Sequence, residues 1–157
     1  MRALFSVFPL LVIPVAIYLI MGFSTGGDPV PVDPSVPGGP MIAPLAAQLN
    51  EGLMTLNMMS GVQWRLANGD MLILLSLAFL FLEILKSTST GTATIMNHAV
   101  SMILFIVCLI LFLLLPNFAT STFFILTTMT LLDVLAGVVV TIVSARRDFA
   151  VGEGFSG

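Results

Sequence analysis

Four long apolar stretches divide this chain of 157 residues. They cover about residues 3–23, 70–87, 95–115 and 119–144. A helix needs about 20 apolar residues to cross the hydrocarbon core of a bilayer, which is roughly 30 Å thick. The uninterrupted runs of Leu, Ile and Phe lack the alternation of a barrel strand, and backbone in hydrocarbon must satisfy its own hydrogen bonds. The sequence therefore predicts an all-α, polytopic membrane protein: a single membrane domain with four transmembrane helices.

The composition agrees with a membrane protein and excludes several other classes. Apolar residues make up 58% of the chain and charged residues only 8%, whereas soluble proteins carry roughly 25% charged residues. The five basic residues are too few to neutralise the ~6–10 phosphates of a typical DNA site, so we expect no nucleic-acid partner. The single cysteine, Cys108, excludes an internal disulfide.

The basic residues predict the orientation in the membrane, because they favour the cytoplasmic side. Four of the five would share one side: Arg2, Lys86, Arg146 and Arg147. We therefore expect cytoplasmic termini, including a tail over residues 145–157, and an outer location for residues 24–69, in a bacterial inner membrane. The first stretch is longer than a signal-peptide core and no A-x-A site follows it, which favours a retained anchor.

The long outer loop has two parts. Residues 24–42 form an arm rich in proline and glycine, expected to be extended. Within residues 43–60, leucines recur at spacings of four, four and three, which predicts a short amphipathic helix on the membrane surface or on a partner.

Short connections and flanking residues predict how the spans are placed. Pro116 starts a very short turn, so the last two spans should form a tight antiparallel hairpin. Aromatic rings and cations suit the headgroup layer. The predicted interfacial anchors are Trp64, Arg65, Arg146 and Arg147.

Asp133 lies near the middle of the fourth stretch, where a carboxylate costs about 2.5–3.5 kcal/mol on insertion scales. Spacings of three and four residues place it on one small, polar helix face: Thr130, Asp133, Gly137, Thr141 and Ala145. Such a face lets helices approach closely and form hydrogen bonds across the contact. We interpret it as a helix-packing face. A proton or ion site, and a signal that docks a particular partner helix, are the alternatives.

Glu83 and Lys86 are three residues apart at the cytoplasmic end of the second span. This spacing predicts an interfacial ion pair in which Lys86 reaches the headgroups. A transport role would require Glu83 to meet Asp133. Counted from the cytoplasmic ends, Glu83 lies about one turn deep and Asp133 roughly 18–20 Å deep, so the sequence predicts separate locations.

His98 is the only histidine, so the chain alone cannot supply two histidines to a haem or several to a zinc ion. It stays a candidate axial ligand to a haem or chlorophyll, or a histidine hydrogen-bonded to the nearby Ser/Thr-rich turn. Met54, Met58 and Met59 form a thioether cluster of the kind that suits Cu(I), although methionines on the apolar side of a surface helix explain it as well. We predict no cofactor and no metal.

No set of residues points to catalysis, since nucleotide-binding loops, C-x-x-C and clustered acid, base and metal ligands are missing from the sequence. We therefore expect no enzyme. The leading hypothesis is a small accessory or structural subunit that binds other integral membrane proteins in a larger complex. The alternative is a homo-oligomeric proton-coupled transporter or channel with a ring of Asp133 carboxyl groups. A third hypothesis is an assembly or insertion factor.

Overall fold

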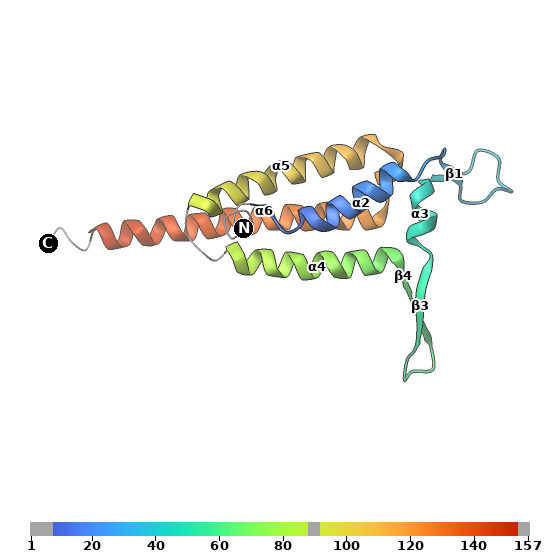
Figure 1. Ribbon diagram of the computed structural model, residues 1–157, viewed down its shortest axis with the longest axis horizontal. Helices are drawn as coiled ribbons and strands as arrows, with labels where there is room; N and C mark the ends of the chain where they lie inside the picture. The colour runs from blue at the N-terminus through green and yellow to red at the C-terminus, as the bar shows by residue number, and fades with distance from the viewer. Residues whose placement is uncertain (1–7, 88–91, 154–157) are drawn as a thin grey trace.

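The computed structural model describes residues 8–87 and 92–153, with the side chains of residues 8–87 and 95–143. The chain is mostly helical and its strands are few and short. In chain order the elements are α2 (Val12–Ser24), β1 (Val30–Pro31), β2 (Met41–Ile42), α3 (Pro44–Leu49), β3 (Gly52–Asn57), β4 (Gln63–Ala67), α4 (Asn68–Ser87), α5 (Thr92–Leu114), the 3₁₀-helix η1 (Pro116–Phe118) and α6 (Ser121–Glu153). The helices α2, α4, α5 and α6 lie alongside one another, whereas the strands and α3 gather at one end of the bundle (Figure 1).

Three helices are long and apolar enough to cross a membrane: Asn68–Ser87, Ile95–Leu114 and Ser121–Val143. The first predicted span, about 3–23, contains α2, which has 13 residues. At 1.5 Å per residue it reaches about 20 Å, less than the bilayer core. The prolines set its start. Pro9 lies in the turn before the helix, and Pro14 lies in the first turn, where a missing N–H breaks no helical hydrogen bond.

The ends of α4 and α6 follow from the local sequence. The Asp70 carboxylate accepts a hydrogen bond from the Ala67 N–H at 3.0 Å, which satisfies a donor at the start of α4. At its other end α6 continues to Glu153, past residue 144 where the last span was predicted to end. The alanines and arginines after residue 144 favour a helix and no proline interrupts them. In Figure 1, α6 therefore extends beyond the ends of α4 and α5.

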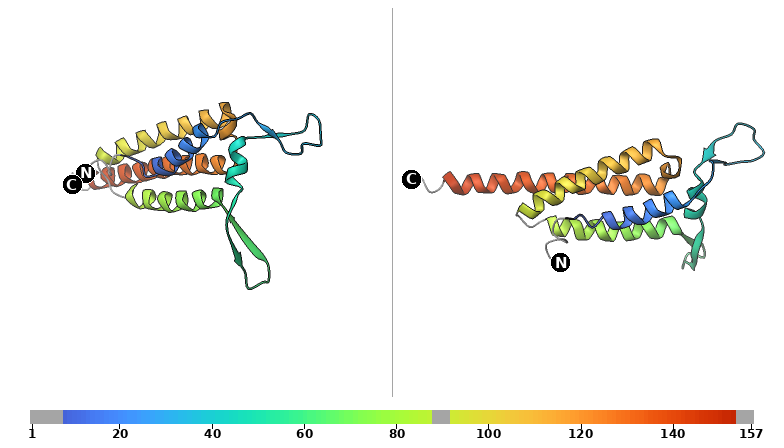
Figure 2. Two further views of the ribbon diagram at one scale, coloured as in Figure 1. Left: turned by 45° about the vertical axis from the view of Figure 1, so that its right-hand side comes forward. Right: turned by 45° about the horizontal axis from the view of Figure 1, so that its top comes forward.

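The central helix of the bundle is α6. In its apolar stretch 44% of the residues are buried, compared with 28% in the apolar stretch of α4 and 17% in that of α5. The short turn through η1 places the end of α5 and the start of α6 at the same end of the molecule, and the two helices cross at an angle (Figure 2). Most of the large apolar side chains of α4 and α5 are therefore exposed on the outside of the bundle.

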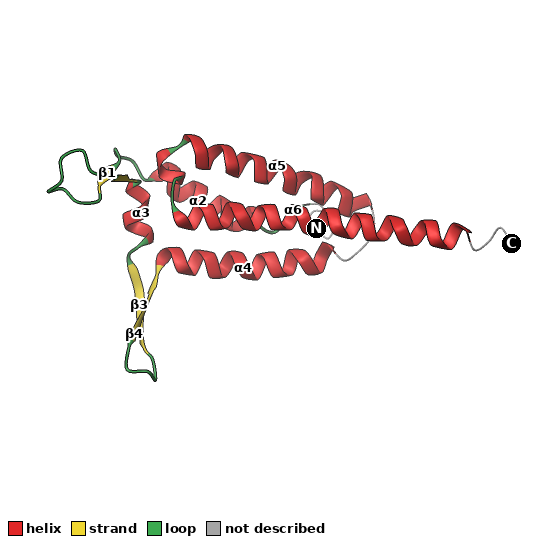
Figure 3. Ribbon diagram, turned by 180° about the vertical axis from the view of Figure 1, so that it is seen from behind, coloured by secondary structure: helices red, strands yellow, loops and turns green. Residues whose placement is uncertain are grey.

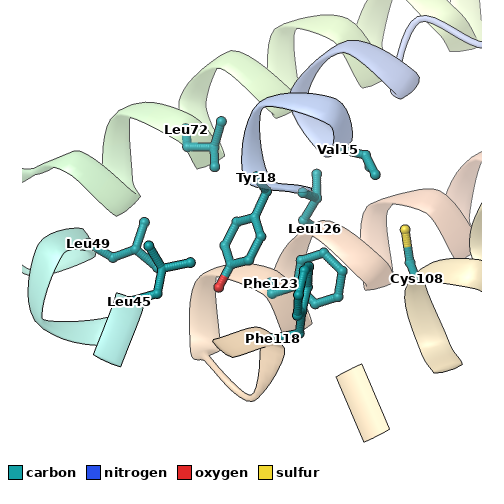
Figure 4. Close-up of a cluster of buried hydrophobic side chains, with 9 residues drawn as sticks. All are labelled: Val15, Tyr18, Leu45, Leu49, Leu72, Cys108, Phe118, Phe123 and Leu126. Atoms are coloured by element: carbon teal, nitrogen blue, oxygen red, sulfur yellow. The ribbon is translucent and has the colours of Figure 1, made fainter. Parts of the chain in front are cut away.

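The larger cluster of buried apolar side chains (Figure 4) includes residues of α3, which lies with the strands at one end of the bundle (Figure 1). Its buried residues are Val15, Tyr18, Leu45, Leu49, Leu72, Cys108, Phe118, Phe123 and Leu126. The rings of Tyr18, Phe118 and Phe123 pack with centroids 4.6 to 5.7 Å apart, and such pairs contribute about 0.5–1.5 kcal/mol each. The two leucines of α3 close this core from outside the bundle, which explains why half of the predicted leucine stripe is buried.

The predicted helix over residues 43–60 forms only as α3, and the rest of that prediction was wrong. Strand β3 pairs with β4 in an antiparallel hairpin, so Leu53 and Leu56 lie in a strand rather than on a helix. Gly52 is unfavourable in a helix, and in the strand the Arg65 side chain packs directly against it, so that a Cβ at this position would displace that side chain. Gly61, with φ of +82°, provides the turn.

The proline-rich arm over residues 24–42 is exposed and closes on itself through β1 and β2. Val30 pairs with Ile42 across this short antiparallel contact. In the loop between the strands, the Asp33 carboxylate accepts hydrogen bonds from the hydroxyl group and the N–H of Ser35, at 2.6 and 2.9 Å. These hydrogen bonds, that of the hydroxyl first, lower the pKa of Asp33 below its ordinary value.

Candidate functional site

Polar side chains gather inside the apolar bundle where α4 ends and α5 begins. The first group, which we name the Glu83 cluster, consists of Glu83, Lys86 and Asn97. Glu83 is fully buried at 0% exposure and Asn97 is 1% exposed. The Lys86 ammonium lies 3.1 Å from the Glu83 carboxylate and 3.0 Å from Asn97 Oδ1, and its side chain keeps 22% of its surface exposed. The two residues predicted as an ion pair thus face each other with an amide beside them.

The Glu83 cluster also binds the backbone that leads into α2. The Leu10 N–H donates a hydrogen bond to Glu83 Oε2 at 2.7 Å, and Lys86 donates one to the carbonyl oxygen of Phe8 at 2.7 Å. The Asn97 amide donates a further hydrogen bond to the Glu83 carboxylate. One carboxylate therefore connects the segment before α2 with α4 and α5.

The second group, which we name the Asp133 site, consists of Asp133 on α6 with His98 and Ser101 on α5. Asp133 and Ser101 are each 1% exposed. Ser101 and His98 both lie close enough to Asp133 to interact with its carboxyl group. Both carboxylate oxygens of Asp133, both ring nitrogens of His98 and the Ser101 hydroxyl are buried, and none has a hydrogen-bond partner among the described residues. A buried carboxylate beside an imidazole is a suitable pair for binding or passing a proton.

Gly137 makes room for this arrangement one turn further along α6. A Cβ at Gly137 would overlap the His98 ring. The glycine is therefore the point at which α6 lets the imidazole approach, as expected for a small residue at a helix contact.

The two threonines of the predicted α6 face differ in exposure but not in the kind of hydrogen bond that they form. Thr130 is 1% exposed and its hydroxyl donates to the Thr127 carbonyl oxygen at 2.7 Å. Thr141 is exposed and donates to the Gly137 carbonyl oxygen at 2.9 Å. Both hydroxyls thus bond within α6 rather than across a helix contact, and the side chain of Ala145 lies outside the described residues.

Glu83 and Asp133 lie at similar depths, contrary to the estimate made from the sequence. Gly69 at the start of α4 packs against Thr122 at the start of α6, so these two helix ends are level. From these two residues Glu83 lies about 21 Å along α4 and Asp133 about 17 Å along α6. The sequence estimate counted from the opposite ends, which are not level because α6 is much longer than α4. Accordingly, Glu83 and Lys86 both interact electrostatically with Asp133.

The predicted interfacial anchors fall into two groups. Trp64 and Arg65 lie on β4, where Trp64 is 47% exposed and Arg65 donates a hydrogen bond to the Asn50 carbonyl oxygen at 3.2 Å. The side chains of Arg146 and Arg147 lie outside the described residues.

A third polar group, which was not predicted from the sequence, joins α2 to the turn between α5 and α6. The Tyr18 hydroxyl lies 2.5 Å from Thr120 Oγ1 and 3.2 Å from the Asn117 carbonyl oxygen. The Asn117 side chain donates to the carbonyl oxygens of Gly22 and Thr25, at 2.9 and 2.7 Å. The available signals were the single tyrosine of the chain and the isolated Asn97 and Asn117, because amides in apolar segments need a partner.

The methionines of the predicted thioether cluster lie on and beyond β3. Met54, Met58 and Met59 are all exposed, Met59 almost completely. Within residues 8–87 and 92–153, no group of three or more His, Cys, Asp or Glu residues is placed to hold a metal ion. Among the described residues, the Asp133 site offers a ligand one carboxylate, one imidazole and one hydroxyl group.

Comparison with known proteins adds no relatives: no protein-family model, curated protein or solved structure matches the chain.

Proposed function

We propose that this protein is a small integral membrane subunit of a larger membrane complex, without catalysis of its own. In this proposal α2, α4, α5 and α6 form a four-helix membrane domain in which α5 and α6 are an antiparallel hairpin. Both termini face the cytoplasm of a bacterial inner membrane, and residues 24–69 face outward. A partner protein binds at the outer surface of the membrane, where the strands gather.

The observation that carries the proposal is the amphipathic character of the hairpin formed by β3 and β4. Residues paired across two strands share a face of the sheet, and neighbours along a strand alternate between faces. The pairs Met54↔Leu66 and Leu56↔Trp64 build an apolar face, and the pairs Thr55↔Arg65 and Asn57↔Gln63 build a polar face. The apolar face of this hairpin is a suitable contact for another protein.

This apolar face is uncovered over most of its length. Met54, Leu56 and Trp64 are 49%, 40% and 47% exposed, whereas Leu66, at the base of the hairpin, is only 5% exposed. The apolar face is therefore covered at the base of the hairpin and uncovered beyond it. An isolated two-stranded hairpin is only marginally stable in water, so a neighbour that covers it stabilises it.

The direction of the hairpin indicates where that neighbour stands. The hairpin projects sideways from the end of the bundle instead of continuing along the helices (Figures 1 and 3). If the helices cross a bilayer, the hairpin runs along its outer surface, away from the bundle. A second integral membrane protein on the α4 side of the bundle, toward which the hairpin extends (Figure 1), would meet both the apolar face of the hairpin and the exposed apolar side of α4.

The test uses two adjacent positions on opposite faces of β3. A photoreactive amino acid is placed at Leu56 in one variant and at Asn57 in its matched control, and native membranes are irradiated. The protein is then purified in mild detergent through a C-terminal tag. We expect a larger integral membrane protein to copurify in fixed ratio and to cross-link from position 56 but not from position 57.

Two results would contradict the proposal. Cross-links from position 56 to lipid alone would make the hairpin a membrane anchor rather than a contact for a protein. A pure homo-oligomer without other proteins would favour the alternative, a proton-coupled transporter or channel. The observation that favours this alternative is the buried Asp133 carboxylate, which has no hydrogen-bond partner among the described residues.

The topology has its own test. Two reporter enzymes are fused after Gly157 in separate variants, one active only in the cytoplasm and the other active only outside it. The cytoplasmic reporter should be active and the other inactive, because the C-terminus is proposed to lie in the cytoplasm. Activity of the reporter that functions only outside the cytoplasm would overturn the proposed orientation.

A further inference from the structure

The Asp133 site concentrates polar atoms that the protein itself leaves unsatisfied. Five buried atoms of Asp133, His98 and Ser101 lack a hydrogen-bond partner among the described residues. Most buried polar groups in proteins are hydrogen-bonded, and groups that are not call for a specific explanation such as a bound ion, a bound water molecule or a chemical role. Three side chains from two helices that share this property at one place form a site rather than an isolated packing defect.

The charges around the site indicate that an ionised Asp133 would lack a positive charge to balance it. Within the described part of the chain, the titratable groups that interact electrostatically with Asp133 are Glu83 and Lys86 on α4 and His98 on α5. Lys86 already forms an ion pair with Glu83, and these two charges cancel. Among the described side chains, Asp133 therefore has no cation left to balance it, unless its own carboxyl group or the His98 imidazole carries a proton. Because an uncompensated charge in an apolar interior is very unfavourable, the neutral arrangement is the stable one.

We propose that the Asp133 site binds one proton, which Asp133 and His98 share. In one form Asp133 is a neutral carboxylic acid and His98 a neutral imidazole. In the other the O–H bond of the carboxyl group is broken, an N–H bond has formed on the imidazole, and the two side chains are a carboxylate and an imidazolium. Both forms have zero net charge, so the proton moves within the site without a change in the total charge of the bundle.

The neighbouring residues have defined parts in this site. Gly137 lets the imidazole approach α6 closely, since a Cβ there would overlap the ring. Ser101, 1% exposed, offers a hydroxyl that donates to a carboxylate or accepts from a carboxylic acid, and so serves both forms. Glu83, fully buried nearby, is neutralised by its ion pair with Lys86 and so leaves the one-proton balance of the site unchanged. The inference concerns the interior of the bundle and does not depend on the partner proposed above.

The experiment counts protons at the site in the full-length protein in lipid nanodiscs at pH 7. The chain has a single histidine, so selective ¹⁵N-histidine labelling reports His98 alone, and the ring ¹⁵N shifts distinguish imidazole from imidazolium. ¹³C labelling of aspartate reports the carboxyl groups, and the signal missing from Asp133→Asn identifies Asp133. We expect the protonated fraction of Asp133 and the imidazolium fraction of His98 to add up to one. A sum near zero or near two would overturn the proposal.

Two variants test where the proton resides and whether the count is specific to this site. In His98→Gln the proton has only one place to go, so we expect the Asp133 signal to be that of a fully protonated carboxyl group, and an ionised signal would contradict the proposal. Asp28→Asn removes an exposed acid in the outer loop and should leave the sum at one. The count in the unmodified protein needs no variant beyond the assignment, so a poorly folded variant does not leave the proposal untested.

Discussion

Removing one partner of the ion pair in the Glu83 cluster should destabilise the bundle, and by different amounts for the two partners. Loss of one member of a buried ion pair costs about 3–5 kcal/mol, because the other charge is left uncompensated. Lys86→Met leaves a carboxylate with 0% exposure, so we expect the full cost of about 3–5 kcal/mol.

Glu83→Gln should destabilise the bundle less than Lys86→Met, because the group left behind is partly exposed and keeps other partners. Glu83→Gln leaves an ammonium group on a side chain that is 22% exposed and still bonds to Asn97 and to the Phe8 carbonyl oxygen. We expect a cost of about 1.5–3 kcal/mol, the range for hydrogen bonds to a charged group. The double variant should cost at least about 1 kcal/mol less than the sum of the single variants, since it leaves no unpaired charge.

The assay is the free energy of unfolding in mixed detergent micelles, measured by titration with sodium dodecyl sulfate at pH 7. Glu51→Gln is the control, because Glu51 is an exposed acid in the outer loop. The reasoning would be refuted if the two single effects added within about 0.5 kcal/mol. It would equally fail if Lys86→Met cost no more than Glu83→Gln.

Three further predictions concern other parts of the molecule. Gly137→Ala should destabilise the bundle by about 1–3 kcal/mol through overpacking, and His98→Ala in the same chain should relieve most of this cost in the same unfolding assay. Tyr18→Phe loses the hydrogen bonds to the turn between α5 and α6 and should lower the free energy of unfolding by about 1 kcal/mol; no change would mean that these hydrogen bonds do not stabilise the fold. Ser35→Ala should raise the pKa of Asp33 toward its ordinary value, measured by its carboxyl ¹³C shift. Because the Asp33 pKa is lowered in the fold, the stabilisation of this loop is complete above the ordinary pKa and lost as the pH falls through the lowered one.

Several features of the fold could be predicted from the sequence because their causes are local. The three long helices correspond to three of the predicted apolar stretches, since backbone in hydrocarbon has few alternatives to a helix. The leucines of α3 were placed on a helix by their spacing, and α3 is helical. The pairing of Glu83 with Lys86 requires only a helix with the two residues three positions apart.

The tertiary structure decided what depends on residues far apart in the chain. Leu53 and Leu56 fit a helical spacing, but pairing with β4 makes their segment a strand, and the spacing alone does not reveal that partner. Helix α2 begins at Val12, after the turn that contains Pro9, and its tyrosine has a hydrogen-bond partner about a hundred residues away.

The relation between Glu83 and Asp133 shows the same limit at the candidate site. Helical periodicity specifies which face a residue occupies, but not how far one helix slides along another. That offset comes from the contact of Gly69 with Thr122 and from the unequal lengths of α4 and α6. The sequence by itself determined that these acids lie on apolar helices. Only packing at the helix ends brought them to one level, because depth in a bundle is a property of contacts between helices.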